Sequence, residues 1–502
     1  MPNIVFDNFN AGQPEDTWNA DKNFFKEAVH LDNYNLPGRI RPYRSWVEIT
    51  GGNEIQNLLF ASDGNLYGLG ADGSNYAEIF EQTTYNGNWT TPSNNNASAG
   101  LVRYNMMFEH QGYIYVWDNV RSIGRFKLDG TAFTTNWFSV PTSVTNSTGA
   151  TIPLSSFGES LGYRYDLNDQ AYFAYSNALF GINNSTDTPV LLLLLPQEYL
   201  IKDMDNWNDY IAVGCQHKEK YNGSKVFFWN TLSADPSFSS NISEGRLEIL
   251  KNVGGELVAI MEFGASTSVR GTSIIASTYD GAQFKERRRI TVSLDREVLT
   301  IREPASLVKN SQLYFGAKIG SDAFIYRFGI NGNAYGMTKD RYVMNDNGDA
   351  SDIFAIEVNG DTFFNSVNAS STTETHRTND VKDYTMTSKP VYTTIRIPAG
   401  KNGEKGKLNY IGVHTVPPID EDSFTPSDQV ITISYRADKD AAFSPLGEHD
   451  AEEQDYTKLA QSGGTFEFPD KWKTIELKAE VEGLAQLHRL EVDWTNVPSD
   501  VG

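Results

Sequence analysis

Residues 58–70, LLFASDGNLYGLG, contain the pattern that decides the fold class. An apolar run is followed by the pair Asp63-Gly64 and then by a second run in which apolar residues alternate with others. A tight hairpin turn requires positive φ angles, which glycine and aspartate tolerate, so this arrangement predicts a β-hairpin. A single hairpin cannot bury its apolar face unaided, so the fold depends on whether the pattern recurs along the chain.

The hairpin pattern recurs six times after residue 70. Each unit has an apolar strand, a polar or glycine turn and an aromatic-rich strand, at residues 106–117, 171–182, 201–213, 247–261, 306–318 and 353–365. From the turn near residue 64 to the turn near residue 359, six intervals span 295 residues. Their mean is about 49 residues, a length typical of four-stranded propeller blades. The recurrence therefore predicts an all-β fold with a seven-bladed β-propeller over residues 51–386.

A second apolar segment follows most of these hairpins and provides the predicted outer strands of the blades. These segments lie at residues 77–80, 123–128, 190–195, 225–229, 273–277 and 324–328. The run at 190–195 is far shorter than a bilayer span, and we interpret it as a buried strand. The seventh unit has no clear outer pair before residue 386. We therefore hypothesise that an early strand at residues 3–8 closes the ring by joining this unit.

The C-terminal part of the chain alternates cleanly between apolar and polar residues. Strands are predicted at residues 392–397, 408–416, 429–436, 472–479 and 488–494. For example, Ile431 and Ile433 share one face, opposite Thr432. One buried and one wet face are typical of an antiparallel sandwich, so residues 387–502 are predicted to form a C-terminal antiparallel β-sandwich. Residues 438–470, which include GEHDAEEQD, are interpreted as a long acidic loop.

Residues 1–50 are predicted to form an N-terminal arm. Apolar residues between residues 17 and 30 recur at roughly helical spacing, which suggests one short helix or turn. Arg39, Arg41 and Arg44 form a local basic cluster in an acidic chain. Two interpretations stay open. The arginines either clamp the arm to acidic loops of its own domain or dock an acidic neighbouring subunit, because arginine forks suit carboxylate pairs.

Composition excludes several classes of partner. The chain has 502 residues and a formal net charge of −22, so direct nucleic-acid binding, which needs a basic surface, is not expected. No basic patch indicates attraction to a membrane, and membrane insertion is not expected. Residues 1–20 lack the pattern of a secretory signal. Cys215 is the only cysteine, so no intramolecular disulfide can form, and its apolar neighbours predict a buried, inert thiol.

No motif predicts catalysis or a metal site. The chain has no S-x-D-x-G-x-T-W box, no G-x-S-x-G elbow and no H-E-x-x-H, and its carboxylates are too abundant to indicate a glycosidase. We therefore expect a protein that is not an enzyme and that uses no cofactor. Acidic clusters at residues 203–209, 345–352 and 419–428 lack the full EF-hand spacing, and solvated turns are preferred over calcium loops.

Two tryptophans are candidates for sugar contact. Trp89 in YNGNWT and Trp137 in FTTNWF lie in polar stretches that are interpreted as loops. Exposed aromatic rings beside asparagine can contact a glycan. Trp117, Trp207 and Trp229, in contrast, lie in or beside predicted strands and are interpreted as packed between blades. Loops on a rigid scaffold are also where binding residues tend to lie.

Both ends of the chain resemble a family of virus proteins. The segments NIVFDNFNAGQ, residues 3–13, and HLDNYNLPGRIRPYRSW, residues 30–46, look like the N-terminal arm of tailed-bacteriophage virion proteins in which the arm precedes a β-propeller. SKPVYTTIRIP, at residues 388–398, and the strands after it resemble the sandwich that follows the propeller in some phage tail components. The acidic stretch at residues 438–470 departs from that pattern.

The resemblance implies a non-catalytic structural subunit of a phage virion, in a ring at the tail tip or nozzle. The implied partners are other virion tail proteins and further copies of the chain in a homo-oligomeric ring, and the implied location is the virion tail, assembled in the host cytoplasm. The alternative is a receptor-binding module that recognises a host surface glycan through propeller loops. A propeller hydrolase is a third interpretation.

Overall fold

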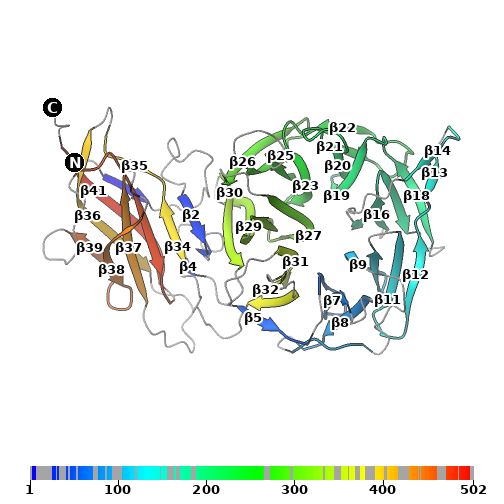
Figure 1. Ribbon diagram of the computed structural model, residues 1–502, viewed down its shortest axis with the longest axis horizontal. Coiled ribbons are helices and arrows are strands. Elements are labelled where there is room, and N and C mark those ends of the chain that lie inside the picture. The colour runs from blue at the N-terminus through cyan, green and yellow to red at the C-terminus, as the bar shows by residue number, and fades with distance from the viewer. Residues whose placement is uncertain are drawn as a thin grey trace. The chain divides into compact units, whose positions relative to one another are not determined.

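The computed structural model describes most of the chain, and every regular element in the described part is a β-strand (Figure 1). The described residues are 3–6, 25–29, 31–32, 41–42, 46–51, 55–71, 77–84, 87–92, 104–118, 121–146, 148–154, 163–165, 170–182, 188–264, 272–293, 298–320, 322–331, 334–343, 352–359, 361–367, 373–378, 390–400, 404–416, 429–438, 440, 442–460, 471–483 and 485–497.

The chain divides into two compact units. One comprises Met1–Trp46, Ile325–Tyr342 and Thr378–Gly502, and the other comprises Val47–Phe324 and Val343–Arg377. The N-terminal arm therefore groups with the C-terminal part of the chain. The sheets between residues 46 and 378 are described first, and the remaining strands after them.

Between residues 46 and 378, strands that follow one another in sequence pair into antiparallel sheets. The first sheets have the orders β6 (Asn57–Phe60), β7 (Leu66–Ala71), β8 (Ala77–Gln82); β12 (Phe133–Ser139), β11 (Ser122–Lys127), β10 (Tyr113–Asp118), β9 (Tyr104–His110); and β15 (Tyr163–Tyr165), β16 (Ala171–Tyr175), β17 (Ala178–Ile182), β18 (Pro189–Leu194). A separate hairpin pairs β13 (Ser143–Thr145) with β14 (Thr151–Pro153).

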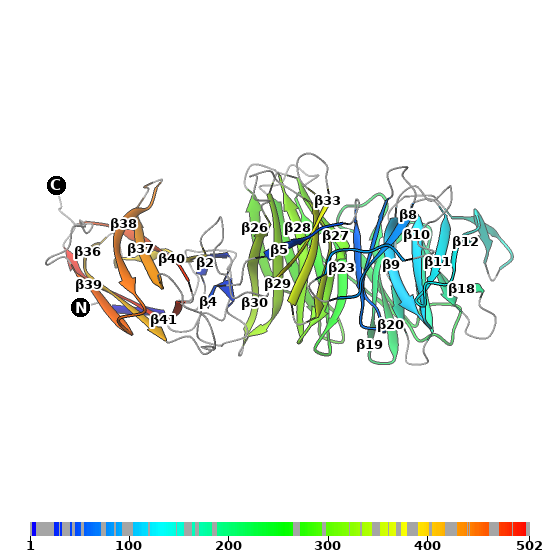
Figure 2. The same cartoon turned by 90° about the horizontal axis from the view of Figure 1, so that it is seen from below.

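Four further sheets complete this series. Their orders are β19 (Tyr199–Trp207), β20 (Tyr210–His217), β21 (Lys225–Trp229), β22 (Phe238–Asn241); β23 (Arg246–Val253), β24 (Glu256–Phe263), β25 (Thr272–Tyr279), β26 (Phe284–Ser293); β27 (Leu299–Lys309), β28 (Gln312–Ile319), β29 (Asp322–Asn331), β30 (Ala334–Val343); and β31 (Asp352–Asn359), β32 (Asp361–Val367), β33 (Thr373–Thr378), β5 (Trp46–Ile49). In the view of Figure 2, many of these strands run in nearly the same, upright direction.

The hairpin predicted at residues 58–70 is confirmed. β6 pairs antiparallel with β7, and Gly64 adopts a φ of 88°, the left-handed conformation that the turn requires. The other six predicted hairpins are also observed. Five of them are the first two strands of their sheets, and the hairpin at residues 171–182 is formed by the second and third strands of its sheet, β16 and β17. Their turns use the same chemistry: both Gly254 and Gly255 have positive φ, as do Asn310 and Ser311.

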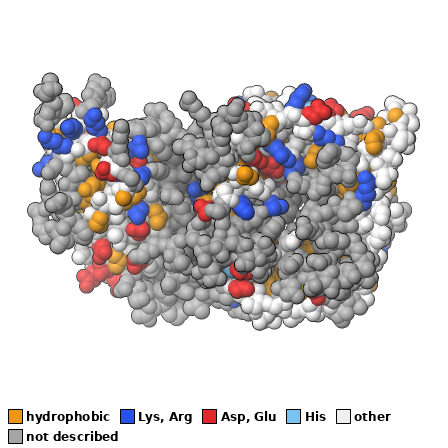
Figure 3. All heavy atoms as spheres, viewed as in Figure 1, with side chains coloured by type: hydrophobic (Ala, Val, Ile, Leu, Met, Phe, Trp, Pro, Cys, Tyr) orange, Lys and Arg blue, Asp and Glu red, His pale blue; other side chains and the backbone are white. Residues whose placement is uncertain are grey.

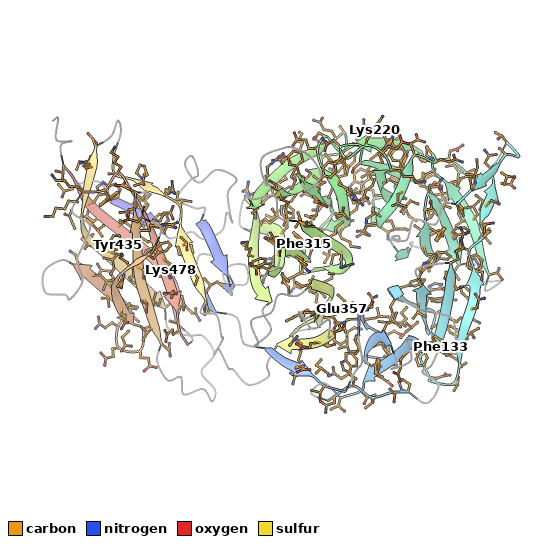
Figure 4. The ribbon with its side chains drawn as sticks, in the orientation of Figure 1. Phe133, Lys220, Phe315, Glu357, Tyr435 and Lys478 are labelled. Carbon is orange, nitrogen blue, oxygen red and sulfur yellow. The ribbon has the colours of Figure 1, made fainter. Side chains whose placement is uncertain are left out.

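The first strands of most successive sheets lie against one another. β6 contacts β9, β15 contacts β19, and the series continues through β23, β27 and β31. β31 in turn contacts β6, so the order of the sheets returns to its start (Figure 1). Apolar cores fill the spaces between neighbouring sheets; one combines Trp117 of β10 with Phe173 and Tyr175 of β16. Figure 4 shows this filling, with Phe315 of β28 fully buried.

The strand that completes the last sheet is not the predicted one. β1 (Asn3–Phe6) pairs with β41 (Gln486–Val497), so the hypothesis that residues 3–8 close the ring is wrong. β5 instead occupies the edge of the sheet beside β33. The physical reason is burial: Ile49 joins the core that Leu58 and Leu66 form, whereas Phe6 is buried in the C-terminal core.

The remaining strands form two antiparallel sheets that share one core. The orders are β1, β41, β36 (Lys405–Val416), β39 (Tyr456–Ala460), and β2 (Phe25–Val29), β34 (Val391–Thr394), β40 (Thr474–Val481), β37 (Val430–Ala437), β38 (Ser444–Asp450), with β35 (Ile397–Pro398) on β40. Their common core includes Ile411 and Leu490 from the first sheet and Ile433 and Leu477 from the second. The alternation predicted for these strands is therefore confirmed.

Three local predictions are corrected. Residues 25–29 form strand β2 rather than part of a helix, because they pair with β34. Part of the predicted acidic loop at 438–470 is strand: β38 pairs with β37 in one sheet, and β39 pairs with β36 in the other. The aliphatic run predicted as a buried strand is β18, an edge strand whose Val190 is 46% exposed.

Candidate functional site

Two aspartates on β19 connect that strand to β23 of the next sheet. Asp203 is fully buried, and its Oδ2 accepts the backbone N–H of Leu250 at 2.7 Å. Its Oδ1 accepts a bond from the Lys251 ammonium at 2.9 Å. Asp205, two residues along, accepts the backbone N–H of Asn252 at 2.9 Å through its own Oδ2. Both carboxylates therefore accept backbone N–H groups from β23, a strand of the neighbouring sheet.

The spacing of these residues explains the bonds. Side chains two residues apart share a face of a strand, as do backbone groups two residues apart. β19 and β23 are both edge strands of their sheets, so the N–H groups of Leu250 and Asn252 lack partners within their own sheet. Asp203 and Asp205 satisfy them. An unpaired buried N–H would cost about 1–3 kcal/mol, so the arrangement fixes the two sheets in one register.

The sequence predicts solvated turn residues for the acidic cluster at residues 203–209, and this is correct only for Asp209. Asp203 and Asp205 are buried in β19 and accept N–H groups. Among the described residues, no group of three or more His, Cys, Asp or Glu side chains could hold a metal ion. Residues 345–351 and 419–428 lie outside the described part of the chain. Their assignment as turns stays a prediction.

A second polar cluster lies on the same pair of sheets. Glu248 of β23 is buried; its Oε2 is 3.3 Å from the Lys202 ammonium of β19, and its Oε1 accepts a bond from Gln216 of β20 at 2.9 Å. The Arg246 guanidinium bonds the Gln216 Oε1 at 2.8 Å. The cluster thus pairs opposite charges across the boundary between the sheets, which a buried charge requires.

Glu262 of β24 lies beside this cluster and titrates abnormally. Burial is the main cause that raises the pKa of the Glu262 carboxyl to about 7; the nearby Glu248 carboxylate also raises it, and Arg246 and Lys202 oppose the rise. The neutral carboxylic acid is therefore favoured in the folded protein below neutral pH.

Glu262→Gln is expected to stabilise the protein at pH 8 by about 2 kcal/mol and to change its stability little at pH 4.5. The folded pKa lies above the ordinary value of 4.5, so the folded state binds the proton more tightly. Stability is consequently lost as the pH rises from about 4.5 through about 7, and glutamine removes this loss. Urea unfolding at both pH values measures the effect. Glu219→Gln, at an exposed position, is the control; equal effects of the two changes would contradict the assignment.

The predicted arginine cluster is only partly described. Arg41 lies in β4 (Arg41–Pro42), which pairs with β3 (Leu31–Asp32), and its register partner is Asp32. Arg39 and Arg44 lie outside the described residues. This backbone register does not test what the arginine side chains contact, so the own-domain clamp and the docking of an acidic neighbouring subunit both stay predictions.

Neither predicted tryptophan lies in an exposed loop. Trp89 is 5% exposed and packs in a core with Ile55, and its ring comes within 3.1 Å of where a Cβ on Gly68 would lie. The interpretation of Trp89 as an exposed loop residue is therefore wrong, because the ring fills the space above a glycine. Trp137 is half-buried in β12 rather than in a loop, with its ring 5.0 Å from that of Tyr115.

Trp89→Ala is expected to lower the free energy of unfolding by about 3 kcal/mol, since it empties a core position. Trp137→Ala should cost less, because its ring is only half-buried. Denaturant unfolding measures both.

Sugar recognition through Trp137 has its own test on a glycan array. If the full chain binds a glycan, and Trp137→Ala abolishes the binding without unfolding the protein, the result would support the alternative of sugar recognition.

The C-terminal sheets also use charged residues in pairs. Glu476 of β40 is buried between Arg396, whose Nε is 2.6 Å from its Oε1, and Arg436 of β37. Figure 3 shows positive and negative side chains interspersed over this part of the surface. Tyr435 and Lys478, both labelled in Figure 4, belong to the neighbouring strands β37 and β40. Opposite charges placed this way stabilise sheets rather than form a single-sign binding patch.

Sequence reasoning did not identify Glu248, Glu476 or the bonding role of Asp203. The available signal was an acidic residue within an apolar strand, as in YLIKDMDNW at residues 199–207. Buried acidic residues in such strands are expected to be paired or hydrogen-bonded. Their partners lie on other strands, far away in the sequence, so the residues around each acidic side chain do not reveal them.

Comparisons with known proteins do not assign the chain to a family. No family model and no curated protein matches the chain. Among solved structures, the chain is similar to PorZ, a surface component of the type-IX secretion system of Porphyromonas gingivalis, with 10% identity, a TM-score of 0.44, and coverage of 87% of this chain and 60% of that one.

Two further solved structures show a comparable likeness. The structure titled Dos1 propeller has 10% identity, a TM-score of 0.40, and coverage of 67% of this chain and 94% of that one. A chain of the mitotic checkpoint complex has 9% identity, a TM-score of 0.42 and coverage of 67% and 96%. Similarities with TM-scores this low do not support an inference about function. Within the described residues, no helix has the length and hydrophobicity to cross a membrane.

Proposed function

We propose that the chain is a non-catalytic structural subunit of a larger particle. Its closed series of sheets acts as a rigid seven-bladed β-propeller, and its two C-terminal sheets act as a β-sandwich. The sequence resemblance supports one kind of particle, the tail of a tailed bacteriophage, with other tail proteins and further copies of the chain as partners. The corresponding location is the virion, after assembly in the host cytoplasm.

The bonds of Asp203 and Asp205 are the observation that carries the proposal. A catalytic carboxylate must reach a substrate, whereas these two are buried and accept N–H bonds from the next sheet. Glu248 and Glu476 are likewise buried and paired with cations. Asp203, Asp205 and Glu248 therefore connect neighbouring sheets, and Glu476 connects parts of one sheet, which are roles expected of a scaffold.

Two features support the proposed architecture. The contact of β31 with β6 favours a ring of seven sheets, and β5 supplies the outer strand of the last one from a distant part of the chain. The last sheet thus contains strands from both the beginning and the end of the series. Such an arrangement holds the first and last units of a ring together. The shared core of the two C-terminal sheets favours a sandwich.

Labelling of intact particles tests the proposal. A short epitope after Gly502, detected with gold-labelled antibody, is expected to mark the tail of a phage that encodes the chain. A phage without the epitope is the control. Full incorporation of other tail proteins with no label on the particle, or turnover of a surface polysaccharide by the purified chain, would contradict a purely structural role.

A further inference from the structure

An unpaired polar side chain lies at the boundary between the last sheet and the first. Asn365 of β32 is fully buried, and in the described part of the chain neither its amide oxygen nor its amide nitrogen has a hydrogen-bond partner. It lies opposite Ala355 of β31, and directly opposed residues of antiparallel strands share a face. Ala355 belongs to the core that contains Leu58 and Leu66 of the first sheet. The Asn365 amide is therefore on the face of the last sheet that meets the first.

The same core holds a second unpaired polar group. The indole N–H of Trp89 is buried and has no acceptor among the described residues. A buried polar group without a partner loses its hydration on folding and gains no bond in exchange, so it weakens the part of the fold that buries it. At the boundary between β19 and β23, in contrast, Asp203 and Asp205 accept backbone N–H groups. The boundary between the last and first sheets is therefore a weak point of the series.

Strand β5 pairs with the last sheet but is tied to the first sheet by other contacts. Directly after β5, the carbonyl of Thr50 accepts the backbone N–H of Trp89 at 2.9 Å. The next residue, Thr90, bridges to Glu81 of β8 in the first sheet. Ile49 of β5 packs in one core with residues of β6 and β7. Separation of the two sheets therefore breaks the pairing of β5 with β33, because β5 stays with the first sheet.

The composition of β33 fits a strand that becomes an edge when β5 leaves. β33 reads TETHRT, residues 373–378, and contains no Val, Leu, Ile, Phe, Tyr or Trp. The third strands of two other sheets contain the apolar runs VFFW, residues 226–229, and IIA, residues 274–276. Charged residues on a strand edge discourage pairing with another chain. β33 therefore has the sequence of a protected edge strand, although it lies inside its sheet.

We infer that the series of sheets opens reversibly between its last and first sheets, with β5 leaving β33 together with the first sheet. Opening hydrates the amide of Asn365 and the indole N–H of Trp89, and renewed pairing of β5 with β33 closes the series again. Such a sub-global opening requires less free energy than unfolding of the whole unit. The closed series is then a scaffold with one joint. The inference does not depend on the proposed virion role.

Hydrogen exchange of the full chain, measured by mass spectrometry, tests the inference. Asn365→Leu replaces the amide with an apolar group of similar shape, which removes the gain in hydration on opening. Exchange at residues 46–49 and 373–378 is expected to become about tenfold slower. The strand β22, Phe238–Asn241, is an outer strand of the same four-residue length as β5 in another sheet, so its exchange should not change.

Asn177→Leu is the matched control, because Asn177 is also buried but donates a bond to the carbonyl of Leu195 at 2.6 Å. This change should not slow exchange at residues 373–378. A folded Asn365→Leu whose exchange at residues 373–378 equals that of the wild type would overturn the inference. Slower exchange at these residues in both variants would overturn it too.

The wild type provides a second readout that needs no variant. In low urea, residues 46–49 and 373–378 should exchange with one common opening free energy, which lies below that of residues 257–263 in β24. Different opening free energies for β5 and β33 would overturn the inference even if Asn365→Leu failed to fold. Exchange of β33 only through unfolding of the whole unit would do the same.

Discussion

Asp203→Ala is expected to lower the free energy of unfolding by about 3–5 kcal/mol. The change leaves the buried N–H of Leu250 without its acceptor and removes the charge of Asp203 from beside the Lys251 ammonium, whose side chain is 14% exposed. It removes two of the bonds that fix β19 against β23. Denaturant unfolding at pH 7 measures the loss.

Two matched variants separate the bond from the general effect of removing an acid. Asp209→Ala, in the exposed turn after β19, should change stability by no more than about 0.5 kcal/mol. Asp203→Asn keeps the shape and one carbonyl acceptor and should fall between the two. A loss for Asp203→Ala that is no larger than that for Asp209→Ala would contradict the assigned role of the carboxylate.

Ile49→Asp is expected to cost at least about 4 kcal/mol and to release β5 from the last sheet. Ile49 is buried in the core that joins this sheet to β6 and β7, and an unpaired carboxylate there loses its hydration. Hydrogen exchange measured by mass spectrometry should show faster exchange at residues 46–49 and 373–378.

Phe6→Ala is the contrasting variant, because β1 pairs with β41 instead. It empties a core position of the C-terminal sheets and is expected to cost about 3–5 kcal/mol. Exchange should increase at residues 486–497 and stay unchanged at residues 373–378. The reverse pattern, with Phe6→Ala exposing residues 373–378, would restore the hypothesis that residues 3–8 close the ring.

The hairpins could be predicted from sequence because the chemistry of a turn is local. Pairs such as Asp63-Gly64 and Gly254-Gly255 permit the positive φ angles that the chain adopts there. The alternating C-terminal strands were predictable for the same reason, since alternation within one strand identifies its buried face. Both signals depend only on residues that are close together in sequence.

The pairing of distant strands could not be predicted in this way. The strands at residues 3–6 and 46–49 are equally short, and nothing within them shows that one joins β41 and the other β33. Likewise, the aliphatic run at residues 190–195 indicates apolarity but not whether the strand lies at the edge or in the middle of a sheet. Position in a sheet is a property of the whole fold.

The candidate site was missed for a related reason. In DMDNWND, residues 203–209, the spacing of acidic residues is compatible with a loop that binds a cation or with a solvated turn. What distinguishes the actual role is the row of N–H groups on β23, which the sequence near Asp203 does not show. Burial, rather than residue type, turns these carboxylates into structural acceptors.

The copy number of the chain in purified particles tests the proposed structural role most directly. Quantitative mass spectrometry with isotope-labelled reference peptides, applied to gradient-purified phage that encodes the chain, gives this number relative to another tail protein. The account predicts several copies per particle in a constant ratio across preparations. A chain that stays in the unassembled fraction, or a ratio that varies from one preparation to the next, would contradict it.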